Sequence, residues 1–277
     1  MLAKFWDTIS NHFIFRNSVF IGFHFFGLMA LISGVSLGSA LFAVGVYFML
    51  MFGVTAGYHR YFSHKSFKTS RPVQFLLALI GTLSLQKGVL HWAANHRDHH
   101  KYSDKPDDLH SPVQSGFWWS HIGWIMSDKY IETRWHRIKD FSVFPELRWL
   151  NRNWLLVFVL WCALVFFTLG FQYLVWGCFI ATVAAWHITF CVNSLLHVWG
   201  KKAFPSSDES RNNAWLAIPT LGEGWHSNHH YFPSSVKQGF HWWQIDLCYY
   251  VLFCMEKLGL IWDVIRPSPI VLEKELR

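Results

Sequence analysis

Three short segments of this chain concentrate histidine at spacings that suit metal binding. They read HRYFSH at residues 59–64, HRDHH at 96–100 and HSNHH at 226–230. The last two share the pattern H-x-x-H-H, which places residues i, i+3 and i+4 on one face of a helix. Each is therefore expected to present three imidazoles to one point. Histidine is the commonest metal ligand and a poor core residue, so this spacing predicts metal ligation.

A fourth segment, NSLLH at 193–197, places Asn193 and His197 on one helix face. One ion takes about four to six ligands, so a larger set of imidazoles indicates two ions. Imidazole suits zinc, copper, iron and nickel, and the lack of thiolates argues against a Cys-rich structural zinc site. Two redox-active irons held by neutral histidines would activate dioxygen. The four segments contribute nine candidate histidine ligands: His59, His64, His96, His99, His100, His197, His226, His229 and His230.

The other residues that could bind metal are more ordinary. The five cysteines form no Cys-x-x-Cys pair and are expected to be reduced, buried thiols. Histidines that lie singly are expected to be hydrogen-bonded core or interface residues: His12, His24, His91, His136, His187 and His241.

The elements that must position the histidine segments are expected to be membrane helices. The 277-residue chain is 52% hydrophobic and only 15% charged, against roughly 25% charged in an average soluble domain. A bilayer crossing takes about 20 apolar residues, and four runs are long enough. Two lie in residues 18–57, separated by SGVSLG at 33–38, and two lie in 154–192, separated near Gly170. The short turns predict two helical hairpins.

Charge placement predicts the orientation. Lys, Arg, Asp and Glu are absent from residues 18–57 and 154–198, so the charged regions share one side. The positive-inside rule makes that side cytoplasmic, and topology then explains the net charge of +7 without a nucleic-acid partner. Both termini are expected to be cytoplasmic, and no signal peptide is expected.

The expected architecture is a single all-α integral membrane domain, residues 1–277. Four transmembrane helices form two hairpins, and a cytoplasmic helical cap at 58–152 and 193–277 holds a histidine-rich dimetal site. Two further apolar segments are not expected to cross. Residues 72–90 are interrupted by Gln86 and Lys87 and predict a re-entrant or interfacial helix, and 241–262 predict a helix along the interface.

The histidine motifs, with their order and spacing intact, carry a specific resemblance. The segments HRYFSH, HRDHHKYSD, NSLLH and GEGWHSNHHYFP resemble those of the membrane-bound fatty-acid desaturases, in particular the acyl-CoA branch of the stearoyl-CoA, delta-9 type. The resemblance runs from the second apolar run to about Trp243. It implies a mushroom-like helical membrane protein, expected in a bacterial cytoplasmic membrane, with two iron ions under a cytoplasmic cap.

The resemblance also implies a reaction and roles for the site residues. In the family, nine histidines bind the iron pair and an asparagine holds a water that completes one coordination sphere. Carried over, the nine histidines named above are the metal ligands and Asn193 holds the water. The implied reaction uses O2 and two electrons to remove two hydrogens from adjacent methylenes of a long-chain acyl group, leaving a cis double bond at the delta-9 position. No catalytic residue beyond the metal centre is expected.

Acidic and histidine neighbours of the motifs are candidate outer partners of the ligands. They would hydrogen-bond the outer ring nitrogens of ligand imidazoles and fix the tautomers, although each could equally be a solvated or helix-capping residue. The candidates are Glu223, Asp98, His110 and His121, with Asp104, Asp107 and Asp108 less favoured.

The substrate carrier and electron source remain open at this point. Where animal members have a basic residue that helps to hold CoA, this chain has Ala94, so both acyl-CoA and acyl-lipid substrates are considered. Without a fused haem or iron–sulfur domain, electrons are expected from a separate ferredoxin, rubredoxin or small haem protein. The basic residues Arg60, Lys65, Lys68, Arg71, Arg97 and Lys101 would dock an acidic carrier or a phosphate headgroup, or be ordinary positive-inside charge.

Two other classes of membrane protein compete with this reading. The nearer one is a di-iron hydroxylase of an alkyl or acyl chain, which product analysis would distinguish. A haem protein is disfavoured, because His24 and His187 are the only histidines placed inside the expected spans. A transport protein is disfavoured, because these spans contain no Lys, Arg, Asp or Glu to form a polar path.

Overall fold

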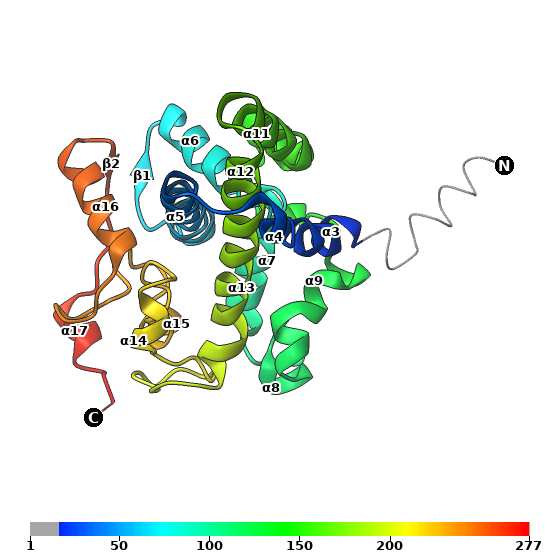
Figure 1. The fold of residues 1–277 in the computed structure, drawn as a ribbon. Coiled ribbons are helices and arrows are strands. Elements are labelled where there is room, and N and C mark those ends of the chain that lie inside the picture. The colour runs from blue at the N-terminus through cyan, green and yellow to red at the C-terminus, as the bar shows by residue number, and fades with distance from the viewer. Residues whose placement is uncertain (1–16, 277) are drawn as a thin grey trace.

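The computed structural model describes residues 17–276, and most of its regular structure in that range is helical (Figure 1). One short antiparallel pair joins β1 (Lys68–Thr69) to β2 (Ile261–Trp262), with Lys68 opposite Trp262 and Thr69 opposite Ile261. The pair ties the segment after the first histidine motif to the C-terminal part of the chain.

The first expected hairpin contains α3 (Ser18–Gly27), α4 (Ala30–Ser33) and α5 (Leu37–Phe52). Gly34, with φ of 64°, turns the chain between α4 and α5, and glycine adopts this φ without the steric penalty of a side chain. Helix α5 then begins with a capping box, in which Ser36 Oγ accepts from the backbone of Ser39 at 3.1 Å and Ser39 Oγ accepts from the backbone of Ser36 at 3.0 Å.

Helix α5 continues without a break into the π-helix η1 (Gly53–Ser63), which carries the first histidine motif. Together they form one helix of 27 residues, Leu37–Ser63, that is long and apolar enough to cross a membrane. Helix α6 (Arg71–Thr82) packs closely on η1, since a Cβ added at Gly53 would lie 2.6 Å from the backbone nitrogen of Gly81. A side chain at residue 53 would therefore force the two helices apart.

The second expected hairpin begins with α11 (Trp154–Leu169) and turns at Gly170, which has φ of 91°. A second helix of 27 residues, Phe171–His197, then runs through the segments labelled α12 and α13 in Figure 1 and is also long and apolar enough to cross. Its four segments are α12 (Phe171–Tyr173), η5 (Leu174–Ile180), α13 (Ala181–Ser194) and η6 (Leu195–His197).

Within residues 17–276 these two helices meet the length and composition expected of a membrane span. A third candidate is α10 (Pro145–Arg152) joined to α11, but the pair is bent by 74°. The helical stretch Ser18–Ser33 is apolar and shorter. The four-helix topology is therefore supported for two helices and stays a prediction for the other two.

The two apolar segments not expected to cross are separate, shorter helices. Helix α6 ends at Thr82, and the region 241–262 contains α16 (Leu247–Lys257). The elements that complete the described chain are α7 (Val89–Tyr102), α8 (Pro112–Ser115), η2 (Trp119–Gly123), α9 (Trp124–Met126), η3 (Asp128–Tyr130), η4 (Trp135–Arg137), α14 (Ala214–Ala217), α15 (His226–Tyr231) and α17 (Pro269–Leu272).

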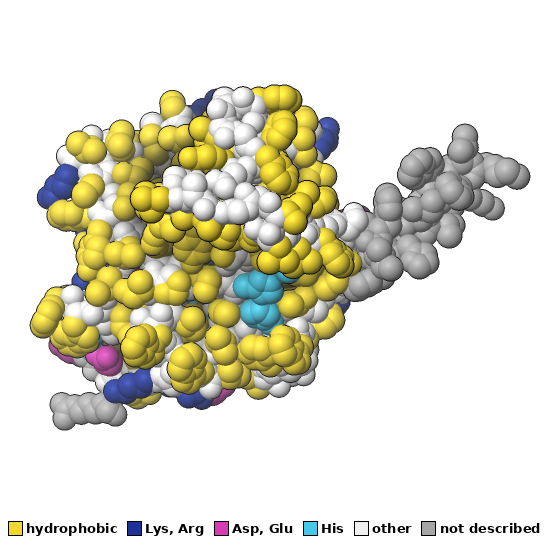
Figure 2. All heavy atoms as spheres, in the orientation of Figure 1, with side chains coloured by type: hydrophobic (Ala, Val, Ile, Leu, Met, Phe, Trp, Pro, Cys, Tyr) yellow, Lys and Arg dark blue, Asp and Glu magenta, His cyan; other side chains and the backbone are white. Residues whose placement is uncertain are grey.

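Large apolar side chains are exposed on both hairpins. Leu31 is 85% exposed and Phe167 is 83% exposed. Figure 2 shows a face covered mainly by hydrophobic side chains, with lysine and arginine side chains near its edges. Soluble monomers rarely expose contiguous apolar surface of this extent, so the surface indicates contact with lipid.

Candidate metal centre

The π-helical register of η1 aligns the first two histidines. The backbone N–H of His64 donates to the carbonyl of His59 at 3.2 Å, so residues i and i+5 are joined across one turn. A straight α-helix would rotate them well away from each other, because it repeats every 3.6 residues. Their rings lie with centroids 4.8 Å apart. A local change of helix type therefore brings both imidazoles to one site.

Helix α7 sends the histidines of HRDHH to two places rather than one. His96 and His100, at i and i+4, join His64, with the Nε2 atoms of His96 and His64 2.9 Å apart. His99 points to a different group. Successive residues on an α-helix are rotated by about 100°, so neighbouring histidines cannot share one point. The prediction that each triplet converges on a single point is therefore wrong.

Helix α15 divides its three histidines in the opposite sense. His226 and His230, at i and i+4, join His99, whereas His229 joins the group of His64. Both H-x-x-H-H helices thus contribute two imidazoles to one group and one imidazole to the other. The result is a five-histidine group, made of His59, His64, His96, His100 and His229, and a four-histidine group, made of His99, His197, His226 and His230.

Within each group the ring nitrogens are close enough to share an ion. All candidate ligand atoms of a group lie within 4.8 Å of one another. In the five-histidine group, Nε2 of His229 lies 3.0 Å from Nε2 of His59 and 2.8 Å from Nε2 of His100. In the four-histidine group, Nε2 of His197 and of His226 are 3.1 Å apart. The Nε2 atoms, rather than the Nδ1 atoms, make these close approaches.

Carboxylates hold the outer nitrogens of several of these rings. Nδ1 of His59 lies 2.7 Å from Oε2 of Glu223. The same kind of contact is made by three aspartates, which accept from the Nδ1 of His99, His197 and His230: Asp108 at 3.0 Å, Asp104 at 2.9 Å and Asp208 at 2.8 Å. Such contacts fix the Nδ1–H tautomer and leave Nε2 free to bind a metal.

The electrostatics keep most of these rings neutral. Burial, reinforced by repulsion from neighbouring imidazoles, holds the pKa of one set of rings well below its ordinary value: His64, His96, His100, His226 and His229. Burial also lowers the pKa of His230 to about 4, despite Asp208. His99 differs, because Asp108 outweighs the effect of burial and raises its pKa. Neutral imidazole is the form that coordinates metal.

The donor set therefore fits a pair of divalent transition-metal ions. Nε2 of His230 is buried and has no hydrogen-bond partner among the described residues. A buried polar nitrogen without a partner is costly, and an ion at this point would satisfy it. The sites offer only nitrogen ligands, which suit iron, zinc, copper or nickel rather than magnesium or calcium.

Three other residues predicted for the site lie near the histidine groups without belonging to them. Asn193 and His110 line a cavity beside the histidines, and the ring of His110 lies 4.2 Å from that of His99. His121 contacts Ser194 at 2.9 Å and His187 at 3.2 Å, rather than one of the nine histidines.

Within residues 17–276, Asp98 makes no hydrogen bond or ion pair with a histidine. Its carboxylate pairs with Arg134 and Arg137 instead, although it is adjacent to His99 in the sequence. The side chain at i−1 on a helix projects to another face, and here it reaches the loop around η4. The prediction that Asp98 supports a ligand ring is therefore not met in the structure.

Two polar partners of the site were not identified from the sequence. Asp208 lies in a loop 22 residues before the ring that it contacts, and no spacing rule connects it to His230. Gln238 Nε2 lies 3.4 Å from Nδ1 of both His59 and His229. Only the course of the loops brings these two side chains to the site.

Arg60 was predicted as part of an exposed basic face, but it is buried. Its guanidinium donates to Asp246 at 3.0 and 3.1 Å and to Glu223 at 3.2 Å, and its side chain is 1% exposed. Because Arg60 and His59 both contact Glu223, the arginine helps to hold this carboxylate in place.

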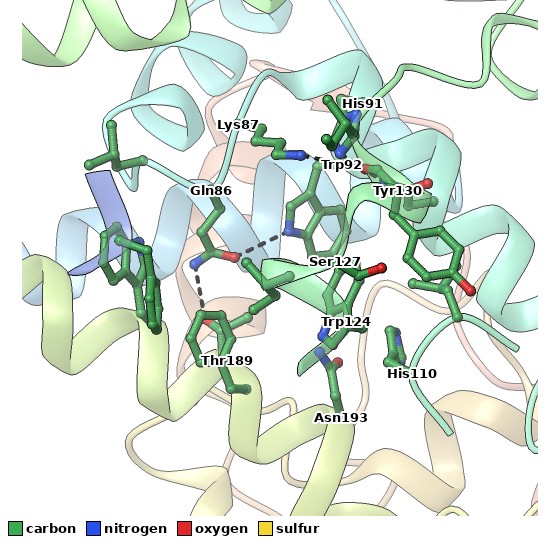
Figure 3. A pocket seen from close by; sticks show the side chains of 18 of the residues that line it. Gln86, Lys87, His91, Trp92, His110, Trp124, Ser127, Tyr130, Thr189 and Asn193 are labelled. Atoms are coloured by element: carbon green, nitrogen blue, oxygen red, sulfur yellow. Dashed lines mark hydrogen bonds between the residues drawn. The ribbon is translucent and has the colours of Figure 1, made fainter. Parts of the chain in front are cut away.

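An apolar cavity of about 320 Å³ lies beside the histidine groups, and His96 and Asn193 form part of its wall. Three polar side chains are linked across the wall: Trp92 Nε1 donates to Gln86 Oε1 at 3.2 Å, and Gln86 Nε2 donates to Thr189 Oγ1 at 3.2 Å (Figure 3). Most of the remaining lining is apolar, including Phe20, Leu85, Ile125, Leu155, Trp186 and Phe190. A cavity of this size and lining suits a slender apolar ligand.

Comparison with known proteins gives a consistent result. The family model for fatty acid desaturases matches residues 37–259. The hex-5-enoyl-[acyl-carrier protein] acetylenase of Moorena producens (strain JHB) is 36% identical over 265 residues, which cover 87% of this chain and 80% of that protein. The sn-2 palmitoyl-lipid 9-desaturase of Nostoc sp. (strain 36) is 36% identical over 260 residues, covering 91% of this chain and 90% of that protein.

A plant relative extends this pattern. The delta-9 acyl-lipid desaturase 1 of Arabidopsis thaliana is 37% identical over 229 residues, covering 82% of this chain and 75% of that protein. The names of the three relatives share a fatty acyl group and differ in its carrier, which is acyl-carrier protein in one and a lipid in the other two.

Proposed function

The chain belongs to the fatty acid desaturase family, and from this premise we propose that it introduces a cis double bond at the delta-9 position of a long-chain fatty acyl group. The acyl group would be carried on CoA or on a membrane lipid. The observation that carries the proposal is the five-histidine and four-histidine groups beside one apolar cavity. As a fatty acyl desaturase the protein is an oxidoreductase of lipid metabolism.

We propose that each histidine group holds one iron ion. The nine histidines would be the protein ligands, and Asn193 would hold a water on the ion of the four-histidine group. Two iron ions bound there would supply the oxidising power by which O2, two electrons and two protons convert a –CH2–CH2– unit into –CH=CH– and two waters. Glu223, Asp104, Asp108 and Asp208 would keep their histidines in the Nδ1–H tautomer.

The cavity would bind the acyl chain and exclude water from the reacting methylenes. In Figure 3, Asn193 and His110 lie on one side of the cavity view, and Lys87 and His91 lie on the other. The hydrogen-bonded side chains Trp92, Gln86 and Thr189 would fix the course of the wall and therefore the methylenes that stand beside the histidines. Regioselectivity would follow from this position, because reacting atoms must be held close together and aligned.

For the membrane arrangement we propose one domain with four crossings. The shorter helix Ser18–Ser33 and the bent pair α10 and α11 would complete the two hairpins begun by Leu37–Ser63 and Phe171–His197. Both termini and the histidine groups would face the cytoplasm of a bacterial cell. The absence of Lys, Arg, Asp and Glu from residues 18–57 and 154–198 supports this arrangement.

The test is expression in a host that lacks its own desaturase, followed by analysis of total fatty acids by gas chromatography with mass spectrometry. We expect a new cis monoene from the unchanged chain, and none from His99→Ala, which removes one nitrogen of the four-histidine group. The control is His136→Ala, at an exposed position in η4, which should retain the product. A hydroxylated chain without an alkene would identify a hydroxylase, and full activity of His99→Ala would refute its ligand role.

A further inference from the structure

A second pocket, of about 250 Å³, reaches the histidine groups and shares no lining residue with the apolar cavity. Its walls come from the end of α7 and the turn after it, the loop before α14, and α15. The lining residues are His100, Lys101, Ser103, Lys105, Ser206, Ser207, Asp208, His230 and Tyr231. Unlike the apolar cavity, this pocket is lined almost throughout by polar and charged side chains, so it does not suit an acyl chain.

The two histidines of this pocket belong to different groups. His100 is part of the five-histidine group and His230 is part of the four-histidine group. Their rings are stacked, with centroids 4.5 Å apart and planes inclined by 28°. The pocket is therefore a place where both candidate metal sites approach the surface together.

Two exposed lysines of this pocket, Lys101 and Lys105, have no carboxylate partner among the described residues. Lys101 instead lies over the ring of Tyr102, 4.7 Å from its centroid. The other basic residues predicted as a docking face are all paired with acids: Arg60 with Glu223 and Asp246, Lys65 and Arg97 with Asp140, Lys68 with Asp263, and Arg71 with Glu146. Lys101 alone remains unpaired in that predicted set.

The acids near the pocket do not cancel the two lysines. Asp208 accepts from the ring of His230, and Glu209 is paired with both Lys202 and Arg211. Asp104, which precedes Lys105, pairs with the ring of His197, and Asp107 is exposed. Among the residues that line the pocket, the two lysines outnumber the one carboxylate, that of Asp208, and a lining with this excess of positive charge attracts an acidic partner.

We propose that the pocket and its two lysines form the docking site of a small acidic electron-carrier protein, and that electrons enter the site through His100 and His230. The inference rests on the proposed function, in which each turnover needs two electrons. Two reduced carriers would each deliver one electron in turn and leave oxidised. The acyl chain would occupy the apolar cavity, so the carrier must approach from another side, and this pocket is lined by a histidine of each group.

The test measures binding of the carrier rather than turnover. The protein is embedded in nanodiscs of neutral phosphatidylcholine, and the affinities of three acidic probes are measured at several salt concentrations: a [2Fe–2S] ferredoxin, a rubredoxin and a small b-type cytochrome. The double variant Lys101→Glu/Lys105→Glu should bind the preferred probe at least about tenfold more weakly at low salt and lose most of the salt dependence. Lys101→Arg/Lys105→Arg should bind as the unchanged chain does.

The matched control is Lys129→Glu/Lys139→Glu, which makes the same change in net charge at exposed positions outside the pocket. Lys129 lies over the ring of Tyr130 much as Lys101 lies over Tyr102, with a distance of 5.4 Å to the centroid. The control should bind the probe normally, and metal content should be the same in all variants. The docking site would be disproved by equal weakening in the control, by unchanged binding of the pocket variant, or by no binding of any probe. The proposed function would fail separately, through the absence of a monoene.

Discussion

Nδ1 of His59 lies 2.7 Å from Oε2 of Glu223, and the other oxygen of this carboxylate accepts from Arg60 at 3.2 Å. One carboxylate therefore joins the five-histidine group to a buried arginine. Glu223 fixes the tautomer of His59 and, through Arg60, is itself held in position.

This relationship predicts a loss of metal affinity in Glu223→Gln. The neutral amide is a weaker acceptor than the carboxylate, so His59 would be a weaker and less well oriented ligand. We expect metal affinity at the five-histidine group to fall about 10- to 100-fold, measured by competition with a chelator. The control is Glu146→Gln, whose carboxylate pairs at 2.7 Å with the exposed Arg71. Equal affinities in both variants would show that Glu223 does not support the ligand.

A second prediction concerns the buried ion pair of Arg60 with Asp246. Asp246 also accepts the backbone N–H of Gln238 at 2.7 Å and of Tyr249 at 2.9 Å. Asp246→Asn leaves a buried guanidinium short of one negative partner, and we expect stability to fall by about 3 kcal/mol in thermal or denaturant unfolding. Asp263→Asn removes the exposed partner of Lys68 and should leave stability nearly unchanged, because water and salt screen exposed ion pairs.

A third prediction concerns pH and His91. Burial lowers the pKa of His91 to about 3, and its Nε2 accepts from Asn95 Nδ2 at 2.9 Å. The unfolded chain takes up a proton below about pH 6.5 while the folded one resists it. The neutral His91 ring therefore contributes to the free energy of unfolding. The contribution is fully present above about pH 6.5 and is lost as pH falls toward 3, by at most about 1.4 kcal/mol per pH unit.

The measurement compares the unchanged chain with His91→Gln, in which residue 91 no longer titrates. We expect the stability advantage of the unchanged chain to shrink by about 2 kcal/mol between pH 7.5 and pH 5. Gln172→Leu, which changes no titratable group, should show a difference that does not vary with pH. If the His91 difference is also independent of pH, the ring is not held neutral by the fold.

A fourth prediction concerns the wall of the apolar cavity. Gln86→Leu removes both hydrogen bonds that link Trp92 to Thr189. Without them the wall can shift, so we expect more than one double-bond position, determined by mass spectrometry of derivatised products. The control is Gln172→Leu, which loses a bond to the carbonyl of Ser33 at 2.9 Å and lines neither pocket. A single unchanged position in Gln86→Leu would show that these bonds do not set the register.

Some of the site follows from the sequence because its determinants are local. The H-x-x-H-H spacing places imidazoles on one side of α7 and α15, and the apolar runs specify helices long enough to cross a membrane. Glu223 is also within reach of sequence reasoning, because it lies close to the third histidine motif.

The tertiary structure decided the features that depend on contacts between distant segments. It determined which histidines share a group, because helix rotation points His99 and His100 in different directions and only the packing of α7 against η1 and α15 supplies their partners. It also determined that Asp208 pairs with His230, that Asp98 pairs with arginines, and that Arg60 is buried. The sequence by itself determined the identity and spacing of the ligand candidates, whereas their division into two sites required the fold, because a helix fixes the direction of a side chain but not what it meets.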